Sequence, residues 1–233
     1  DFFRRAFVNL EPDTLQSQQM QAILRRFHGL RRFLPTNAQG MSWNQATHMV
    51  MRGEAAMQLM GDWVKSEWLN QPDTPPLRCL PAPGSAGRFS YNLDAIALLA
   101  QPDNRQQQAQ DAFSSLLLSE TLQQEFNRRK GSIPPQPQIN LQGFDQCSQD
   151  AVRALQQAMQ QGDLVPSMAE SATLNPAVQQ VILELLSNYF NDADANSHDA
   201  AQQLARVVNA VTGTIKKPIK SNRYKNNNKN NAL

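Results

Sequence analysis

The feature that most constrains the fold is the recurrence of apolar residues at steps of mostly three or four along much of the chain. Such spacing places apolar side chains on one face of an amphipathic helix. It predicts helices over residues 14–34, 43–52, 104–129, 150–161, 176–189 and 198–211. By contrast, the apolar run at residues 89–100, "FSYNLDAIALLA", is typical of a buried strand. The expected fold class is therefore α/β, helix-rich with few strands.

Capping residues mark the ends of several predicted helices. Asp13 stands where the first helix needs an N-cap, and the helix over 104–129 is expected to break near Ser119. Glycines that suit a C-cap follow three helices, at Gly53, Gly131 and Gly162. These residues give the helical segments defined limits.

Two segments are less regular. Residues 71–87, "QPDTPPLRCLPAPGSAG", are rich in Pro and Gly and predict an extended connection, in which residues 78–80 suit a short strand. Residues 54–61, "EAAMQLMG", suit either a short buried strand or a helix, because their periodicity does not distinguish the two.

Charge divides the chain into a body and a tail. The formal net charge is +2, but six bases and no acid fall within residues 216–233, so the remainder carries 16 bases against 20 acids, a net charge of −4. A mildly acidic body does not predict a nucleic-acid partner. Residues 212–233, rich in Lys and Asn, are expected to be disordered because they hold too few apolar residues to offset the entropy of ordering.

Catalytic and membrane signatures are missing from the sequence. There is no Gly-x-Ser-x-Gly elbow, phosphate loop or Gly-rich dinucleotide motif, and the three histidines, His28, His48 and His198, are scattered. Asp62 and Glu170 would suit a glycosidase only if their carboxyl groups stood roughly 5 to 9 Å apart. No run of 18 or more apolar residues suits a transmembrane helix, and the chain does not begin with the Met, basic stretch and apolar segment of a signal peptide. The chain is expected to be the C-terminal part of something longer. We therefore expect a protein that is not an enzyme and that needs no cofactor or metal.

The two cysteines, Cys79 and Cys147, lack a second Cys or a His at metal or redox spacing. A disulfide between them is the simplest prediction, and two buried free thiols are the alternative. A disulfide persists in an oxidising compartment such as the periplasm but not in the cytosol.

Five motifs in order carry a family resemblance: "GEAAMQLMGDW", "CLPAPG", "YNLDAIAL", "FNRRKGSIP" and "GDLVPSMAES". Together they resemble the C-terminal half of the extracellular solute-binding proteins of ABC sugar importers, and are most similar to the periplasmic glucose- and mannose-binding proteins. The resemblance spans about residues 10 to 210 and implies two α/β lobes joined by a hinge. It implies that residues 1–78 and 129–211 form the C-terminal lobe, that residues 79–128 cross the hinge into the N-terminal lobe, and that 212–233 are a tail.

A sugar presents flat C–H faces and a rim of hydroxyls, so its site needs an aromatic plane together with charged or amide groups. Gly61-Asp62-Trp63 supplies both, although Trp63 also suits a cap on the core. Trp68 is expected to pack. The resemblance implies that Trp63 and Asp62 face the cleft.

Three further positions are implied by the resemblance. Asn92 has both donors and an acceptor for vicinal hydroxyls, and Asp94 is the second choice there. Lys130, in "RRKGSIP", lies at a helix end that favours a cation, and in the family this turn faces the ligand. Glu170 stands where close relatives of the glucose-binding type have His, and this departure puts glucose itself in question because an ionised carboxylate only accepts hydrogen bonds.

The resemblance implies a periplasmic substrate-binding component of an ABC transporter that acts as a monomer. Its expected ligand is a glucose- or mannose-like monosaccharide or a small oligosaccharide, which it delivers to the permease subunits in the membrane. The alternative is a binding protein for a non-sugar solute, or a sensor or adhesion domain on the same fold.

Overall fold

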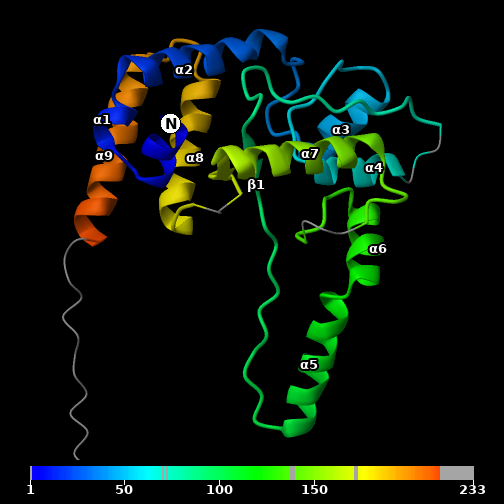
Figure 1. Ribbon diagram of the computed structural model, residues 1–233. Coiled ribbons are helices and arrows are strands. Elements are labelled where there is room, and N and C mark those ends of the chain that lie inside the picture. Colours follow the sequence, from blue (N-terminus) through cyan, green and yellow to red (C-terminus); the bar gives the residue numbers. More distant parts are fainter. Residues whose placement is uncertain (1, 70, 72, 137–139, 171–172, 216–233) are drawn as a thin grey trace, which may run out of the picture. The chain divides into compact units, whose positions relative to one another are not determined.

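A computed structural model describes residues 2–69, 71, 73–136, 140–170 and 173–215, with side chains as far as Ala210. The chain divides into two compact units (Figure 1). The first unit combines residues up to 29 with those from 174 onward, and the second unit comprises residues 30–173.

The first unit is a packed group of helices. Its elements are a π-helical turn at Arg4–Val8 and the helices α1 (Pro12–Leu15), α2 (Gln18–Gly29), α8 (Pro176–Asn191) and α9 (Ser197–Ile215). Helix α9 packs against α1, α2 and α8. The side chains buried between them are mostly aliphatic and include Leu15, Met20, Leu24, Ile182, Leu204 and Val208. This burial follows the apolar spacing and confirms helical structure across most of these predicted segments.

The first predicted helix, residues 14–34, is not continuous. It begins at Pro12, so Asp13 lies inside α1 and Glu11 takes the N-terminal flanking position. Proline is favoured in the first helical turn because its missing N–H would have no partner there. The helix then breaks at Ser17, whose hydroxyl donates to the Thr14 carbonyl and accepts from the Met20 N–H. Side-chain hydrogen bonds of this kind compete with the helical ladder.

Helix α9 runs to Ile215, four residues into the stretch predicted to be disordered. That prediction is therefore wrong for residues 212–215, where the helical pattern continues past Val211. The rest of the predicted tail, residues 216–233, lies outside the described residues.

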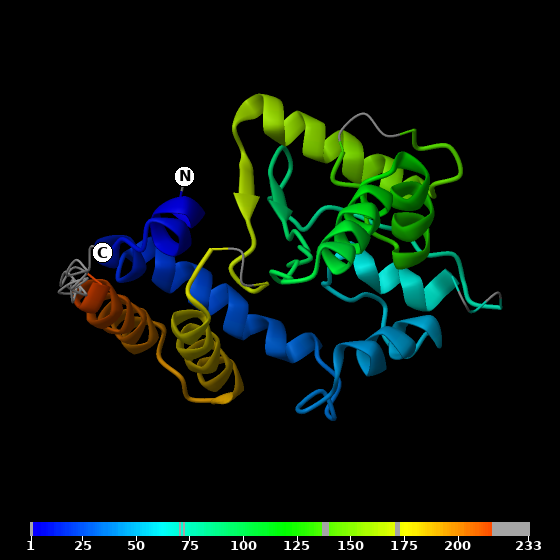
Figure 2. The same ribbon diagram turned by 90° about the horizontal axis from the view of Figure 1, so that it is seen from below.

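The second unit holds the elements that carry the predicted site. They are a 3-10 turn at Leu30–Phe33, α3 (Trp43–Met51), a 3-10 turn at Asp62–Val64, α4 (Lys65–Leu69), β1 (Phe89–Tyr91), α5 (Asn104–Leu117), α6 (Glu120–Lys130), α7 (Gln146–Gln161) and β2 (Leu164–Pro166). Strands β1 and β2 pair in parallel, with Phe89 opposite Leu164 and Tyr91 opposite Pro166 (Figure 2). The α/β prediction, with helices outnumbering strands, is confirmed.

Capping chemistry sets the helix ends in this unit. Ser119 separates α5 from α6 and its hydroxyl accepts from the Leu122 N–H, as predicted. Gly131 and Gly162 close α6 and α7 in the left-handed conformation that glycine adopts without strain. Helix α7 begins at Gln146, four residues before its predicted start, because the Asp145 carboxylate caps it by accepting from the Ser148 N–H at 2.7 Å.

The long buried strand predicted over residues 89–100 is wrong beyond Tyr91. Figure 1 shows the following residues as an extended connection from β1 to α5, and Leu93, Ile96 and Leu99 are exposed. A buried strand needs neighbours along its whole length, and within the described chain β1 pairs only with the three residues of β2. Helix α5 likewise has no buried residue, and the apolar side chains Phe113, Leu116 and Phe126, which the helical spacing places along one face, are exposed.

Residues 54–61 form neither a strand nor a helix. Met57 and Leu59 are 83% and 81% exposed, while Gln58 between them bonds to the Thr47 hydroxyl and the Trp43 carbonyl. The short strand predicted at residues 78–80 is also not formed, and Leu80 is 86% exposed. In each case, the apolar side chains lack a covering layer within the described residues.

The predicted disulfide is present between Cys79 and Cys147, whose Cα atoms lie 5.5 Å apart across 68 positions of sequence. It joins the Pro-rich connection to the first turn of α7, so the alternative of two free thiols is wrong. Among the described residues, no helix is both long and apolar enough to cross a membrane.

Candidate functional site

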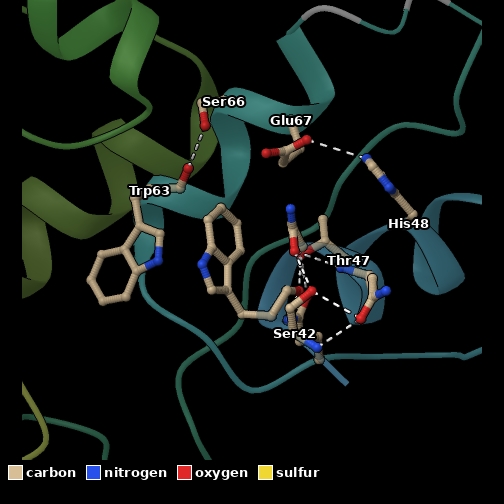
Figure 3. Close-up of polar contacts among 10 residues, drawn as sticks. Ser42, Thr47, His48, Trp63, Ser66 and Glu67 are labelled. Atoms are coloured by element: carbon tan, nitrogen blue, oxygen red, sulfur yellow. Dashed lines mark hydrogen bonds and ion pairs between the residues drawn. The ribbon is translucent and has the colours of Figure 1, made fainter. Parts of the chain in front are cut away.

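The turn Gly61-Asp62-Trp63 brings an indole and a carboxyl group to one place. Gly61 is extended, and the six-membered ring of Trp63 folds back over it so closely that a Cβ at residue 61 would overlap the indole carbons Cζ3 and Cη2. The Trp63 carbonyl accepts from the Ser66 hydroxyl at 2.8 Å, which ties the turn to the start of α4 (Figure 3). The order Gly-Asp-Trp therefore has a steric reason, because only glycine leaves room for this indole.

The Asp62 side chain is partly buried and lies near positively charged side chains. Burial raises the pKa of its carboxyl group above the ordinary value of 3.8, and the positive charges of Lys65 and Lys130, with a hydrogen bond from the Ile133 backbone, act in the opposite direction. When it is ionised, the Asp62 carboxylate is a strong hydrogen-bond acceptor for a hydroxyl.

Lys130 ends α6, immediately before Gly131. Its ammonium group forms an ion pair with the Asp94 carboxylate and lies 5.9 Å from the centre of the Phe126 ring. The side chain is one-third exposed, and the carbonyl groups at the helix end favour its charge. Lys130 can therefore donate to a ligand while Asp94 limits its movement.

Asn92 follows β1 and is exposed. Its amide group donates to the Asp94 carboxylate at 3.5 Å, so Asn92, Asp94 and Lys130 form a connected polar row. Asp94, the second choice at this position in the sequence, is the residue that joins the two predicted ones.

Glu170 lies beyond the end of β2 and is exposed, with its backbone N–H donating to the Ser167 hydroxyl at 3.3 Å. Because β1 and β2 run parallel, Asn92 and the residues after Pro166 leave the sheet at the same edge. The Ser167 N–H bonds to the Tyr91 carbonyl at 2.8 Å and continues this pairing. Within the described residues, no hydrogen bond or ion pair joins the Glu170 carboxylate to the other predicted site residues.

The structure thus joins Asn92 and Lys130 through Asp94, and the Asp62 carbonyl lies against the turn after Lys130, with Trp63 next to Asp62 in the chain. Trp68 is half-buried, and its indole N–H donates to the Pro75 carbonyl at 3.0 Å. Sequence reasoning missed the buried lysine at Lys65 and its partner Asp145, which lie 80 positions apart. The lysine within "GDWVKSEW" was the sequence signal that could have revealed this buried charge.

Helix α4 contacts both the Asp62–Val64 turn and α3. The His48 imidazole contacts the Glu67 carboxylate at 3.2 Å, and the Ser42 hydroxyl with Gln45 forms the capping box that starts α3 (Figure 3). Within the described residues, no group of three or more His, Cys, Asp or Glu is arranged to hold a metal ion.

A shallow hollow of about 380 Å³ lies elsewhere in the second unit, around the start of α3. Its lining is mostly polar and consists of Asn37, Gln39, Gly40, Met41, Gln45, Met49, Arg52 and Glu54. None of the predicted site residues lines this hollow, so it does not belong to the polar row of Asn92, Asp94 and Lys130.

Comparison with known proteins gives consistent matches over nearly the whole chain. A probable sugar-binding periplasmic protein of Brucella suis is 32% identical over 213 residues, which is 91% of this chain and 50% of the relative. The corresponding protein of Rhizobium meliloti is also 32% identical over 213 residues, covering 91% of this chain and 51% of the relative. The chain is homologous to these proteins. The resemblance predicted from the five motifs is therefore confirmed.

A more distant homologue is an uncharacterized ABC transporter extracellular-binding protein of Pyrococcus horikoshii, 27% identical over 170 residues, which is 73% of this chain and 36% of the relative. The chain spans about half the length of the curated sugar-binding relatives that it matches. No family model matches the sequence.

Proposed function

We propose that the chain belongs to a periplasmic substrate-binding component of an ABC transporter, and that it captures a glucose- or mannose-like monosaccharide or a small oligosaccharide. The names of the homologous proteins of Brucella and Rhizobium support a sugar ligand and the periplasm. The disulfide of Cys79 with Cys147 supports an oxidising compartment.

The observation that carries this proposal is the polar row of Asn92, Asp94 and Lys130, with the Asp62 carbonyl against the turn after Lys130 and Trp63 next to Asp62 in the chain. These residues offer two carboxylate acceptors, an ammonium donor and an amide that donates and accepts. An aromatic plane beside such a set matches a pyranose, whose C–H face and hydroxyl rim need both kinds of contact. No covalent step is required of these residues, and we propose a binding protein rather than an enzyme.

We further propose that residues 1–78 and 129–211 form one lobe and that residues 79–128 cross a hinge into a second lobe. The apolar side chains exposed between β1 and α5 and on α5 itself support this division, since a lobe packed over them would remove their apolar surface from water. Closure of the two lobes around the ligand would then present the protein to the permease subunits, and the protein would act as a monomer.

Glu170 bears on which sugar is bound. The segment that carries its exposed carboxylate leaves the sheet at the same edge as the segment that carries Asn92. When ionised, this carboxylate can only accept hydrogen bonds. It therefore favours a hydroxyl that donates, or the ammonium group of an amino sugar, and we propose that it selects between hexoses at the rim of the site.

The test is a titration of intrinsic tryptophan fluorescence with a panel of hexoses, amino sugars and disaccharides. It uses the chain itself and a chimera in which the chain replaces the matching half of the Brucella suis relative. We expect one sugar to quench the emission and Trp63→Ala to abolish the response. Trp68→Phe is the matched control, because the Trp68 indole N–H donates to the Pro75 carbonyl and Trp68 is not among the proposed ligand-binding residues. No response to any sugar in the folded chimera would contradict the proposal.

A further inference from the structure

Lys65 is a buried cation two positions after Trp63. Its side chain is only 4% exposed, and its ammonium group lies 3.2 Å from each carboxylate oxygen of Asp145 and also bonds to the Ser148 hydroxyl. A lysine is rarely buried unless its charge is paired, because desolvation is costly. The position of Lys65 therefore depends on Asp145.

Asp145 belongs to a rigid part of the unit. Its carboxylate caps α7 by accepting from the Ser148 N–H, and Cys147 in the same helical turn forms the disulfide with Cys79. The Asp145 side chain is 43% exposed, so its own charge stays hydrated without Lys65. Lys65 therefore needs Asp145 to pair its charge more than Asp145 needs Lys65.

The first carbon of the Lys65 side chain also lies close to the turn after Lys130. A Cβ at residue 131 would lie 2.8 Å from the Lys65 Cβ and 3.0 Å from the Asp62 carbonyl oxygen, so the turn after Lys130 packs directly on the turn before Trp63. Lys65 therefore lies where the turn that carries Asp62 and the turn after Lys130 meet.

We infer that Lys65, held by Asp145, is a positioning residue that fixes the Asp62-Trp63 turn against the Lys130-Gly131 turn in the ligand-binding geometry. The inference rests on the proposed function. Buried ion pairs generally add little stability compared with apolar residues of the same shape, so the position of this lysine is better explained by geometry than by stability.

The test compares Lys65→Met, which keeps the stem and removes the charge, with Asp145→Asn, which keeps the N-cap and removes the ion pair. Asp150→Asn is the matched control, because Asp150 pairs with Arg153 on the exposed side of the same helix. Each variant is measured for sugar affinity, for melting temperature and, without ligand, for the ¹⁵N NMR signal of the Trp63 indole, assigned by its loss in Trp63→Phe.

We expect Lys65→Met and Asp145→Asn each to shift the ligand-free Trp63 signal and to weaken sugar binding by about tenfold or more, as misplaced binding groups do. Asp150→Asn should change neither. A fall in melting temperature with unchanged affinity and an unchanged Trp63 signal would overturn the inference, and so would wild-type behaviour of folded Asp145→Asn. If the wild-type protein binds no sugar, the proposed function fails, and the ligand-free Trp63 signal still decides whether Lys65 positions the turn.

Discussion

The Asp94 carboxylate and the Lys130 ammonium form an ion pair across 36 positions of sequence, which joins the segment after β1 to the last turn of α6. The amide of Asn92 donates to the Asp94 carboxylate, and the positive charge of Lys130 acts to lower the pKa of the Asp62 carboxyl group. Groups from three separate parts of the chain thus come together without a metal-binding cluster among the described residues.

Asp94→Asn should separate binding from stability. The Asp94 side chain is mostly exposed, so losing the ion pair should lower the free energy of unfolding by less than about 1 kcal/mol. Sugar affinity should fall roughly tenfold, equivalent to about 1.4 kcal/mol, because an acceptor is lost and Lys130 is released. Denaturant unfolding and sugar titration measure the two effects. Glu125→Gln, which removes exposed ion pairs within α6, the helix that ends at Lys130, is the control and should leave affinity unchanged.

Asp62→Asn should stabilise the protein at neutral pH. Because burial raises the pKa of Asp62 in the folded state, the folded protein binds its proton more tightly than the unfolded chain. The stability of the wild type should therefore fall, relative to Asp62→Asn, as pH rises from the unfolded pKa near 3.8 through the raised folded value. Melting temperatures of both proteins between pH 4 and 8 measure this difference.

Glu54→Gln is the matched comparison for that pH series. A hydrogen bond from Arg52 lowers the pKa of Glu54, so the wild type should gain stability relative to this variant as pH rises. Equal pH trends for Asp62→Asn and Glu54→Gln would contradict the assigned cause of the Asp62 shift.

Gly131→Ala should destabilise the protein more than Gly162→Ala. Both glycines have positive φ, +85° and +72°, which costs an alanine about 1 to 2 kcal/mol. Only at residue 131 would the new methyl group also press on Lys65 and Asp62, whereas the space at residue 162 is open. We expect a further loss of at least about 1 kcal/mol for Gly131→Ala in urea unfolding. Equal losses would show that the two turns are not packed as described.

Replacing Cys79 and Cys147 together by Ser should lower the free energy of unfolding by about 2 to 4 kcal/mol, because the unfolded chain regains the freedom that the long loop had lost. Unfolding curves with and without a reducing agent measure this effect. The reducing agent should destabilise the wild type and leave the double variant unchanged. No effect on the wild type would contradict a stabilising role for this disulfide.

Local sequence signals made the helix ends predictable, whereas they could not predict whether the apolar run after β1 would be buried. Ser119, Gly131 and Gly162 end or begin helices through capping rules that depend on a few neighbouring residues. The run from Leu93 to Leu99 has the composition of a buried strand, but burial requires a covering layer that composition cannot supply. Asp94 and Lys130 were each visible as candidates, and the resemblance proposed the lysine. Their ion pair, like that of Lys65 with Asp145, depends on tertiary contacts between distant segments.

The most direct test of the central claim is an NMR titration of the sugar-responsive protein with the sugar that quenches its fluorescence. It follows the Trp63 indole, the Asn92 side-chain amide and the Lys130 ammonium group in the same samples. The account predicts that all three signals shift and saturate with one common dissociation constant. Saturation of the protein with sugar while any of the three signals stays unmoved would contradict a shared site.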